Sequence, residues 1–437
     1  MEVLNYQSDK NRIENYINSR GFEVETDIIA GVAEIVKDVK NSGDNAIFSY
    51  TRKFDGADMD KLTVDQPEID KAYDSIEQRF IDSLKQAEDN IRNFHEKQVS
   101  QSWFDNRENS MLGQLVNPLE RIGAYVPGGK AGYPSSVLMS VIPAQTAGVD
   151  DITVVTPPGE DGKINPYTLV AADLIGVDNL YKVGGAQAVA GLAYGTETIT
   201  SVDKIVGPGN IYVTLAKKQV YGLVDIDMLA GPSEVLILAD ESANPAYIAA
   251  DLLSQAEHDS RAIPILITTS DKIINEVKKE LQEQLQEVSS KEVVERAEKS
   301  IERNGMIIKV ESISKGLYLT NQIAPEHFEL LVENPLSYLG DIQNAGAIFL
   351  GEYTPEPVGD YIAGPNHILP TGGTARYASP LTVDDFIKKS SILYYKKEKL
   401  NSLKDDITTM AELEGLPCHA KSIKKRFGID EKKGRDC

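Results

Sequence analysis

The stretch RIGAYVPGGKAGYPSSVLMSVIPAQTAGVDDITVVTPP, residues 121–158, sets the pattern from which the fold is predicted. It begins with a short β-rich run that ends in Pro and Gly, continues through an apolar helix-like segment, and returns to a β-rich run at 151–155. A strand, a helix and a second strand in this order are typical of a βαβ unit, in which a crossover helix joins two parallel strands. This stretch therefore predicts a parallel sheet covered by helices.

The same alternation continues from this stretch to about residue 351. Further β-rich runs are NLYKVGG, DKIVGPGN, EVLILAD, AIPILITTS, MIIKV, HFELLVE and GAIFLGE. Helix-like stretches separate them, including a long charged helix predicted near 271–304. These strands could form one large sheet or two, and their number favours two α/β domains. Ligands are then expected at the carboxyl ends of the strands, near the crevice between the domains.

Helical segments are predicted on both sides of this α/β region. Residues 1–20 have the pattern of a short polar helix with Ser8 as its N-cap. Helices are also predicted over 26–43 and over 67–98, and the tail from Thr382 is predicted to be entirely helical. The fold class predicted from the sequence is therefore α/β, with small helical segments at the two ends.

Composition and charge narrow the range of partners. The 437-residue chain has a formal net charge of −22, which repels nucleic acid and anionic membranes, so small molecules or proteins are the expected partners. The first residues lack the apolar core of a signal peptide, and no apolar run is long enough to span a membrane. Two cysteines cannot form a disulfide framework for this length, which favours a reducing compartment, and we expect a cytoplasmic protein.

The two cysteines also argue against thiol catalysis. An aldehyde dehydrogenase that works through a thiol needs a nucleophilic cysteine in its active site. Cys437 is the last residue, and Cys418 neighbours His419 on a predicted helix, where adjacent side chains diverge. Neither cysteine is expected to take part in the chemistry.

Three glycine-rich turns each lie between a predicted strand and a predicted helix. They are YVPGGKAGYPSS at 125–136, VGGAQAVAG at 183–191 and VGPGN at 206–210, and no G-x-G-x-x-G fingerprint occurs. Glycine at such turns lets a ligand approach the backbone, and a helix N-terminus favours a phosphate group. Each turn alone is also explained by ordinary βα-turn chemistry. Three turns at strand ends of one domain together favour a nucleotide site.

The five histidines give a weaker indication of a metal site. Gln255 and His258, in LLSQAEHDSRA, are three residues apart and point the same way on a helix. A metal site would also need Asp360, which lies in a long loop rich in Pro and Gly, and His419. Imidazole and carboxylate suit zinc, whereas glutamine is an uncommon ligand. Spacing alone leaves this site open, because any one histidine is more often structural, and His95 in a charged helix is expected to lie on the surface.

The motifs taken together resemble the signature blocks of the histidinol dehydrogenase family. The blocks occur in the order of that family and cover about residues 26–426: RIGAYVPGG, VGGAQAVAGLAYGTETI, VDKIVGPGN, DMLAGPSEVLILAD, LLSQAEHD, NQIAPEHFELL, GDYIAGPNHILPT and EGLPCHAKSIKKR. The resemblance implies oxidation of L-histidinol to L-histidine through the aldehyde in two NAD-linked steps, the last step of histidine biosynthesis. It also implies one zinc ion per subunit and a homodimer.

The resemblance assigns roles to individual residues. It implies zinc ligands at Gln255, His258, Asp360 and His419, and an acid/base pair at Glu326 and His327. It implies substrate contacts at Ser233, Glu414 and His327, with the zinc ligands Gln255, His258, Asp360 and His419 also lining the substrate. It implies NAD contacts at Tyr125, Gln187 and Asn210. The roles of Cys418 and His367, if any, stay open.

The resemblance also implies two Rossmann-like domains with parallel-rich sheets and short helical ends. We expect an N-terminal helical segment at 1–20, and a first α/β domain of 21–118 and 238–378 with most of the zinc and catalytic residues. The NAD-binding domain is expected at 119–237, and a helical tail at 379–437 is expected to exchange onto the partner subunit. His419 and Glu414 would then reach the partner's active site.

The chemistry of the reaction sets expectations for the acid/base pair. His327 suits removal of the hydroxyl proton, because the ordinary pKa of histidine lies near working pH. Glu326 would activate water for the second oxidation, which needs its pKa raised by burial. Adjacent residues in extended backbone point to opposite faces, so the turn at Pro325 must bend the chain for both to serve one site. Zinc is expected mainly to anchor the amino group and imidazole of the substrate.

Two other classes of function stay open at this point. A zinc hydrolase, with Glu326 as the base that activates water, would need no nucleotide site, so the three glycine-rich turns count against it. A non-catalytic protein with zinc bridging a dimer would account for a four-ligand site, but it leaves the APEHFELL segment at 324–331 unexplained.

Overall fold

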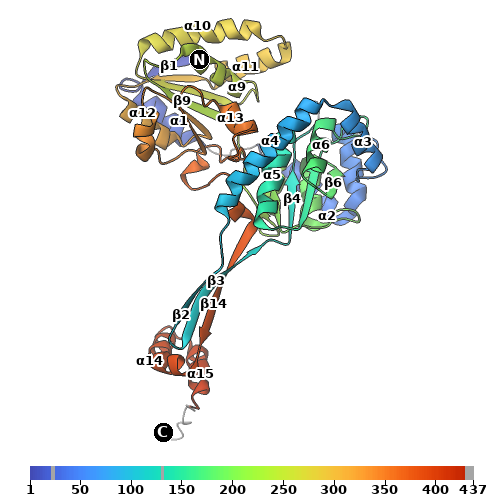
Figure 1. The fold of residues 1–437 in the computed structure, drawn as a ribbon, viewed down its shortest axis with the longest axis vertical. Helices are drawn as coiled ribbons and strands as arrows, with labels where there is room; N and C mark the ends of the chain where they lie inside the picture. Colours follow the sequence, from blue (N-terminus) through green and yellow to red (C-terminus); the bar gives the residue numbers. More distant parts are fainter. Residues whose placement is uncertain (21–24, 129–131, 429–437) are drawn as a thin grey trace. The chain divides into compact units, whose positions relative to one another are not determined.

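The computed structural model describes residues 1–20, 25–128 and 132–428, which divide into two compact units (Figure 1). The first unit contains the described residues of 1–99 and 119–386, and the second contains those of 100–118 and 387–437. The first unit holds two parallel sheets with helices on their faces, which confirms the predicted α/β class. Every helix in the described part of the chain is too short or too polar to cross a membrane.

The larger sheet has six strands in the order β1-β11-β10-β9-β12-β13, and all neighbouring pairs are parallel. The strands are β1 (Glu2–Asn5), β9 (Glu234–Ala239), β10 (Ile263–Thr268), β11 (Met306–Lys309), β12 (His327–Leu331) and β13 (Ala347–Leu350). Strand β9 is buried at every residue, because its side chains pack alternately into apolar clusters on the two faces. One face carries α1 (Lys10–Ser19) and α12 (Ile313–Ile323), and the other carries α9 (Pro245–Ala256), α10 (Asp271–Glu287) and α11 (Lys291–Arg303).

The smaller parallel sheet has five strands in the order β6-β5-β4-β7-β8. They are β4 (Arg121–Tyr125), β5 (Asp151–Thr156), β6 (Asn179–Lys182), β7 (Lys204–Val206) and β8 (Asp225–Ile226). One face packs against α3 (Gln66–Ser75), α4 (Gln78–His95), α5 (Pro134–Ala147) and α6 (Pro166–Leu174). The other packs against α2 (Thr26–Asp55), α7 (Gly185–Tyr194) and α8 (Ile211–Val220). The glycine-rich turns therefore lie between a strand and a helix, as the sequence predicts.

The predicted domain limits differ from the packing in two places. Helices α2, α3 and α4 were grouped with 238–378, but they share the apolar clusters of the five-stranded sheet. Their apolar stripes complement the helices of that sheet, a choice that periodicity alone does not specify. Strand β9 begins at Glu234, so residues 234–237 belong to the six-stranded sheet and not to the predicted domain of 119–237.

The second unit is a three-stranded antiparallel sheet followed by two helices. Its strands β2 (Trp103–Arg107), β3 (Ser110–Pro118) and β14 (Ile387–Tyr395) have the order β14-β3-β2, and α14 (Lys397–Leu413) and α15 (Pro417–Arg426) follow. The prediction of an entirely helical tail is therefore wrong for 387–395. Strand β14 pairs along its whole length with β3, and a partner so far away in the sequence leaves no local signal.

Three local predictions also need correction. Residues 271–304 form two helices, because the Ser290 side chain caps a new helix by accepting a hydrogen bond from the Val293 N–H. Within α2 the first helical segment ends at Gly43 as predicted, where a φ of +52° makes a kink, but a second helical segment that was not predicted follows directly. At the N-terminus the strand β1 precedes α1, whose N-cap residue is Asp9 in place of Ser8.

The remaining elements are short. The loop after β13 contains the helix α13 (Glu356–Tyr361), and 3-10 turns occur at η1 (Glu96–Gln98), η2 (Pro335–Asp341), η3 (Thr374–Arg376) and η4 (Val383–Phe386). His95, at the end of α4, is fully buried and its Nδ1 hydrogen-bonds the Ile91 carbonyl oxygen at 2.8 Å, so the expectation that it lies on the surface is wrong.

Candidate active site

The C-terminal end of α9 carries two of the predicted metal ligands, Gln255 and His258. The His258 Nδ1 lies 2.8 Å from the Ser254 carbonyl oxygen. Because a carbonyl oxygen can only accept, Nδ1 carries the ring proton and Nε2 keeps a free electron pair. Gln255 is fully buried, and its amide oxygen and nitrogen have no hydrogen-bond partner among the described residues. A buried amide without partners is costly, so both side chains have ligand atoms ready for a further group.

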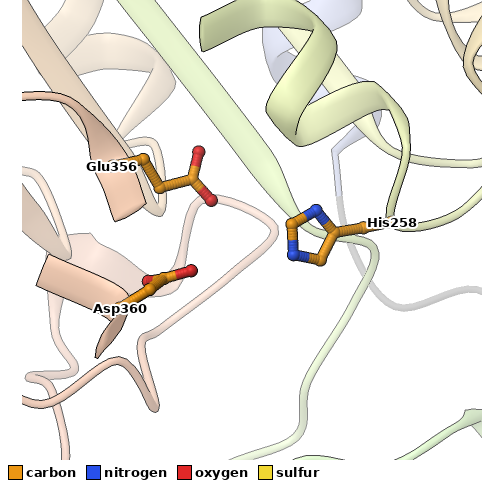
Figure 2. Close-up of side chains that lie close together, drawn as sticks. All are labelled: His258, Glu356 and Asp360. Carbon is orange, nitrogen blue, oxygen red and sulfur yellow. The ribbon is translucent and has the colours of Figure 1, made fainter. Parts of the chain in front are cut away.

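Two carboxylates from α13 meet the His258 imidazole (Figure 2). Ligand atoms of His258, Glu356 and Asp360 all lie within 4.8 Å of one another. Glu356 and Asp360 are four residues apart, so they share one face of the short helix. The structure thus brings together His258 and Asp360, as predicted, and adds Glu356. The sequence signal for Glu356 is the pair of carboxylates at i and i+4 in EPVGD, residues 356–360.

Neighbouring groups hold α13 in place. Its N-terminal Glu356 N–H donates to the Glu329 carboxylate at 3.0 Å, and the His367 Nδ1–H donates to the Asp360 carbonyl oxygen at 3.0 Å. Burial lowers the pKa of His367 to about 4, so this ring is neutral and keeps its single proton for that bond. His367 therefore orients the backbone that carries Asp360, which gives this residue a structural role.

Glu326 and His327 lie where the chain leaves α12 and enters β12. Ala324 takes a left-handed conformation with a φ of +51°, and the strand begins at His327. The Glu326 Oε2 accepts a hydrogen bond from the Glu234 N–H at 2.8 Å, and the His327 Nδ1–H donates to the Glu234 carbonyl oxygen at 3.0 Å. The two side chains converge, with 3.8 Å between the His327 Nδ1 and the Glu326 Oε2. The chain therefore bends here as an acid/base pair requires.

Burial controls the protonation of this cluster. It raises the pKa of Glu326 well above its ordinary value, and the nearby carboxylates of Glu234, Glu356 and Asp360 raise it further. It raises the pKa of Glu356 to about 7 and that of Asp360 to about 6. It also lowers the pKa of His327, whose Nε2 has no hydrogen-bond partner in the described part of the chain and lies 3.9 Å from the Asp360 Oδ1. A bound cation would oppose the upward shifts of the three carboxylates and would favour the neutral form of His327 still further.

A cavity of about 520 Å³ lies beside these groups. His327, Asp360 and His367 supply polar lining, while Phe349 and Leu381 are among its apolar walls. An unpaired imidazole nitrogen next to a carboxylate, in a cavity of this size, suits proton exchange with a small polar molecule.

A second cavity, of about 490 Å³, contains all three predicted NAD contacts, Tyr125, Gln187 and Asn210. The Tyr125 hydroxyl accepts a hydrogen bond from the Gly185 N–H at 3.1 Å, and the Asn210 side chain caps α8. Gln187 is buried, and neither atom of its amide is hydrogen-bonded within the described ranges. Asp55, which sequence reasoning missed, also lines this cavity, and burial raises its pKa to about 6. Residues 129–131 of the predicted turn 125–136 lie outside the described residues.

One of the two cavities lies at the carboxyl ends of parallel strands, and the other lies beside residues at the amino ends. Tyr125 ends β4, and Gln187 and Asn210 follow β6 and β7, so the second cavity lies at the carboxyl ends of its strands, as predicted. His327 is instead the first residue of β12, and its partner Glu234 is the first residue of β9. The prediction that ligands bind at carboxyl ends is therefore wrong for this group, because α9 runs back along the sheet and ends at its amino edge.

The remaining predicted residues belong to other segments of the chain. Glu414 and His419 belong to the second unit, at the end of α14 and in α15. Ser233 is half-buried directly before β9, next to Glu234. Cys418 is an exposed free thiol, and Cys437 lies outside the described residues.

Comparison with known proteins finds that the chain is similar over nearly its whole length to histidinol dehydrogenases. The family profile described as histidinol dehydrogenase matches residues 18–427. The chain is 54% identical over 402 residues to the histidinol dehydrogenase of Clostridium acetobutylicum, covering 92% of this chain and 93% of that protein. It is 51% identical over 417 residues to that of Heliobacterium mobile, covering 95% and 97%. A crystal structure of histidinol dehydrogenase from Elizabethkingia anophelis superposes with a TM-score of 0.92 at 39% identity, covering 98% of both chains.

Proposed function

The chain belongs to the histidinol dehydrogenase family, and on this premise we propose that it oxidises L-histidinol to L-histidine through the aldehyde, in the last step of histidine biosynthesis. The observation that carries the proposal is the convergence of Glu326, His327, His258 and Asp360 beside one cavity. It supplies two groups for proton transfer and two metal ligands. The proposed location is the cytoplasm, which suits the free Cys418 thiol.

His327 is the proposed base of the first oxidation. Its Nδ1–H is committed to the Glu234 carbonyl oxygen, so Nε2 is the atom that accepts the hydroxyl proton as hydride leaves the carbon. Burial keeps the free imidazole neutral by lowering its pKa, and Asp360 at 3.9 Å then stabilises the imidazolium that forms. The carbon–oxygen single bond of the alcohol becomes the carbonyl of the aldehyde.

Glu326 is the proposed base of the second oxidation. Water adds to the aldehyde when Glu326 takes one of its protons, and the resulting diol loses hydride to give the carboxylic acid. A buried carboxylate with a raised pKa is a stronger base than an ordinary one, and the bond from the Glu234 N–H fixes its Oε2. The hydrolase alternative uses the same base, but it has no use for the second cavity.

A zinc ion is the proposed metal, held by Gln255, His258 and Asp360 and completed by His419 of a second subunit. Support comes from the unpaired Gln255 amide, the free His258 Nε2 and the adjacent carboxylates, a mixture of nitrogen and oxygen ligands that suits zinc. When bound, zinc would act as a Lewis acid that anchors the amino and imidazole nitrogens of the substrate. Ser233 and Glu414 are the further proposed substrate contacts. Glu356 is near enough to compete as a ligand.

NAD is the proposed hydride acceptor, one molecule for each oxidation. The buried unpaired amide of Gln187 offers a donor and an acceptor at the carboxyl edge of the five-stranded sheet, close to the N-terminus of α8, where the helix dipole favours the negative charge of a phosphate. The Asp55 carboxylate offers an acceptor for ribose hydroxyls in the same cavity. Tyr125 provides an aromatic wall whose hydroxyl is fixed by the Gly185 N–H.

A homodimer with exchanged tails is the proposed assembly. The second unit exposes large apolar side chains, among them Leu413 at 83% and Leu393 at 70% exposure. Apolar surface of this kind favours contact with another protein surface. A second copy would cover it and could deliver Glu414 and His419 to the site of the partner.

The proposal is tested by incubating zinc-loaded protein with L-histidinol and NAD and following NADH by its absorbance. Two NADH per L-histidine are expected, and His327→Asn is the matched inactive control. Absence of NADH from properly folded, metal-loaded protein would refute the dehydrogenase assignment. Hydrolysis of a test amide by the same preparation would favour the zinc hydrolase.

A further inference from the structure

Arg20, the residue that follows α1, reaches into the base of the candidate active site. Its guanidinium forms an ion pair with the Glu234 carboxylate and also donates to the Ile323 carbonyl oxygen. The side chains of Arg20 and Glu234 are only 5% and 2% exposed. Glu234 is the hydrogen-bond partner of Glu326 and His327, and Ile323 precedes them in the chain by three and four residues.

Both side-chain oxygens and both backbone polar groups of Glu234 form hydrogen bonds. Its side chain accepts from Arg20 at one oxygen and from the Gly372 N–H at the other, at 3.0 Å. Its backbone N–H donates to Glu326 and its carbonyl oxygen accepts from His327. The peptide groups on the two sides of this one residue therefore set the positions of both acid/base side chains.

The second contact of Arg20, with the Ile323 carbonyl oxygen, lies at the start of the turn that leads to Glu326. Ile323 is the last residue of α12, and its carbonyl oxygen lies just before the left-handed Ala324 that bends the chain toward Glu326. One guanidinium thus ties the end of α12 to the start of β9. These are the two backbone segments whose separation determines the geometry of Glu326 and His327.

Stability alone is a poor explanation for this ion pair. Burying two charges costs about as much solvation as their attraction returns, and an apolar pair of similar size is often as stable. A planar guanidinium with several donors in fixed directions is instead suited to holding two acceptors in one geometry.

We propose that Arg20 is a positioning residue, which acts through Glu234 and Ile323 to hold Glu326 and His327 in register for proton transfer. The inference rests on the proposed dehydrogenase function for its kinetic readout. The structural readout is independent of that function, because the His327 hydrogen bond to Glu234 can be observed in the absence of any reaction.

The test compares Arg20→Met with Arg20→Lys and with the charge-balanced double variant Arg20→Met/Glu234→Gln. Arg20→Met should lower kcat about 100-fold, the loss expected for a misplacement of about 1 Å, with KM for L-histidinol and NAD changed less than about threefold. Lysine offers one compact group in place of the fork, so Arg20→Lys should recover part of kcat. The double variant should regain thermal stability without regaining kcat.

A structural readout separates this inference from the proposed function. The chain has five histidines, so nitrogen NMR of labelled histidine side chains can identify His327 by comparison with His327→Asn. Wild-type protein should show the Nδ1–H form with a strong hydrogen bond, and Arg20→Met should shift that signal or give a mixture of tautomers.

The matched control is Lys204→Met, which removes another buried cation, in β7 of the other sheet, paired with Asp225 at 3.1 Å and Asp385 at 3.3 Å. It should lower stability and leave kcat of the folded protein unchanged. Three results would each overturn the positioning role: an unchanged His327 signal in Arg20→Met, a kcat loss no larger than the unfolded fraction, or recovery of kcat in the double variant. If wild-type protein makes no NADH, the dehydrogenase proposal fails, and the His327 signal alone decides the role of Arg20.

Discussion

The two cavities of the first unit are built on parallel sheets, yet they use opposite edges. The cavity around Gln187 lies at carboxyl ends of strands, where helices α7 and α8 begin and the positive ends of their dipoles favour anions. The cluster around His258 lies at an amino edge, where α9 ends and the negative end of its dipole favours cations. The helix dipoles therefore favour the proposed phosphate-binding role at one edge and the proposed metal-binding role at the other.

The groups at the two edges also differ in their charge. The amino-edge cluster gathers buried carboxylates with raised pKa values, whereas the cavity at the carboxyl edge has amide, hydroxyl and glycine groups and one carboxylate, Asp55. Clustered acids suit proton transfer and metal binding, and neutral donors suit a bound nucleotide. Changes at one edge should consequently leave the binding function of the other edge intact.

The largest effect is expected at His327. His327→Asn removes the base of the first oxidation and should lower kcat about 1,000-fold, while NAD binding measured by calorimetry stays the same. Glu326→Gln should instead stop the reaction at the second oxidation, so that supplied aldehyde is no longer converted to L-histidine. Loss of NAD affinity in either variant would contradict the separation of the two edges.

Metal affinity gives the next largest effect. Gln255→Leu should weaken zinc binding at least about 10-fold, as measured by competition with a chelator, because the buried amide, which has no other partner among the described residues, is a proposed ligand. Glu356→Gln is the matched comparison. Equal weakening by Glu356→Gln would make Glu356 a ligand in its own right, and no weakening by Gln255→Leu would exclude the amide.

A smaller effect is expected at the nucleotide edge. Gln187→Leu should raise the Kd for NAD about 10-fold, which corresponds to the loss of about one good hydrogen bond. Zinc content measured on the same preparation should not change. A variant that loses zinc as well as NAD affinity would show that the edges are coupled.

The smallest effect concerns pH. The folded-state pKa values of Asp360, about 6, and Glu356, about 7, are raised above their ordinary values, so the metal-free fold holds these protons more tightly than the unfolded chain. Their contribution to stability is present at low pH and is lost as pH rises through about 6 to 7. Zinc replaces the protons, so it should raise Tm by a few degrees more at about pH 8 than at about pH 5. Asp360→Asn should reduce this difference, and an equal shift at both pH values would contradict it.

The sequence by itself determined the α/β class, and it favoured two parallel sheets and pointed, through the family resemblance, to most of the candidate residues at both edges. Buried parallel strands such as EVLILA and the turns that follow them are local patterns, so periodicity and glycine placement identify them. The family blocks named Gln255, His258, Glu326, His327 and Asp360 without a structure, and they named Tyr125, Gln187 and Asn210 as well.

Only the tertiary structure decided which segments meet. It joined β14 to β3, placed α2 to α4 on the five-stranded sheet, buried His95, and brought Glu356 and Arg20 to the catalytic group. Each of these facts depends on a partner distant in the sequence, and a polar residue looks the same in the sequence whether it is solvated or buried against such a partner. The amino-edge location of the catalytic pair was hidden for the same reason, because it follows from the direction in which α9 and α12 run back along the sheet.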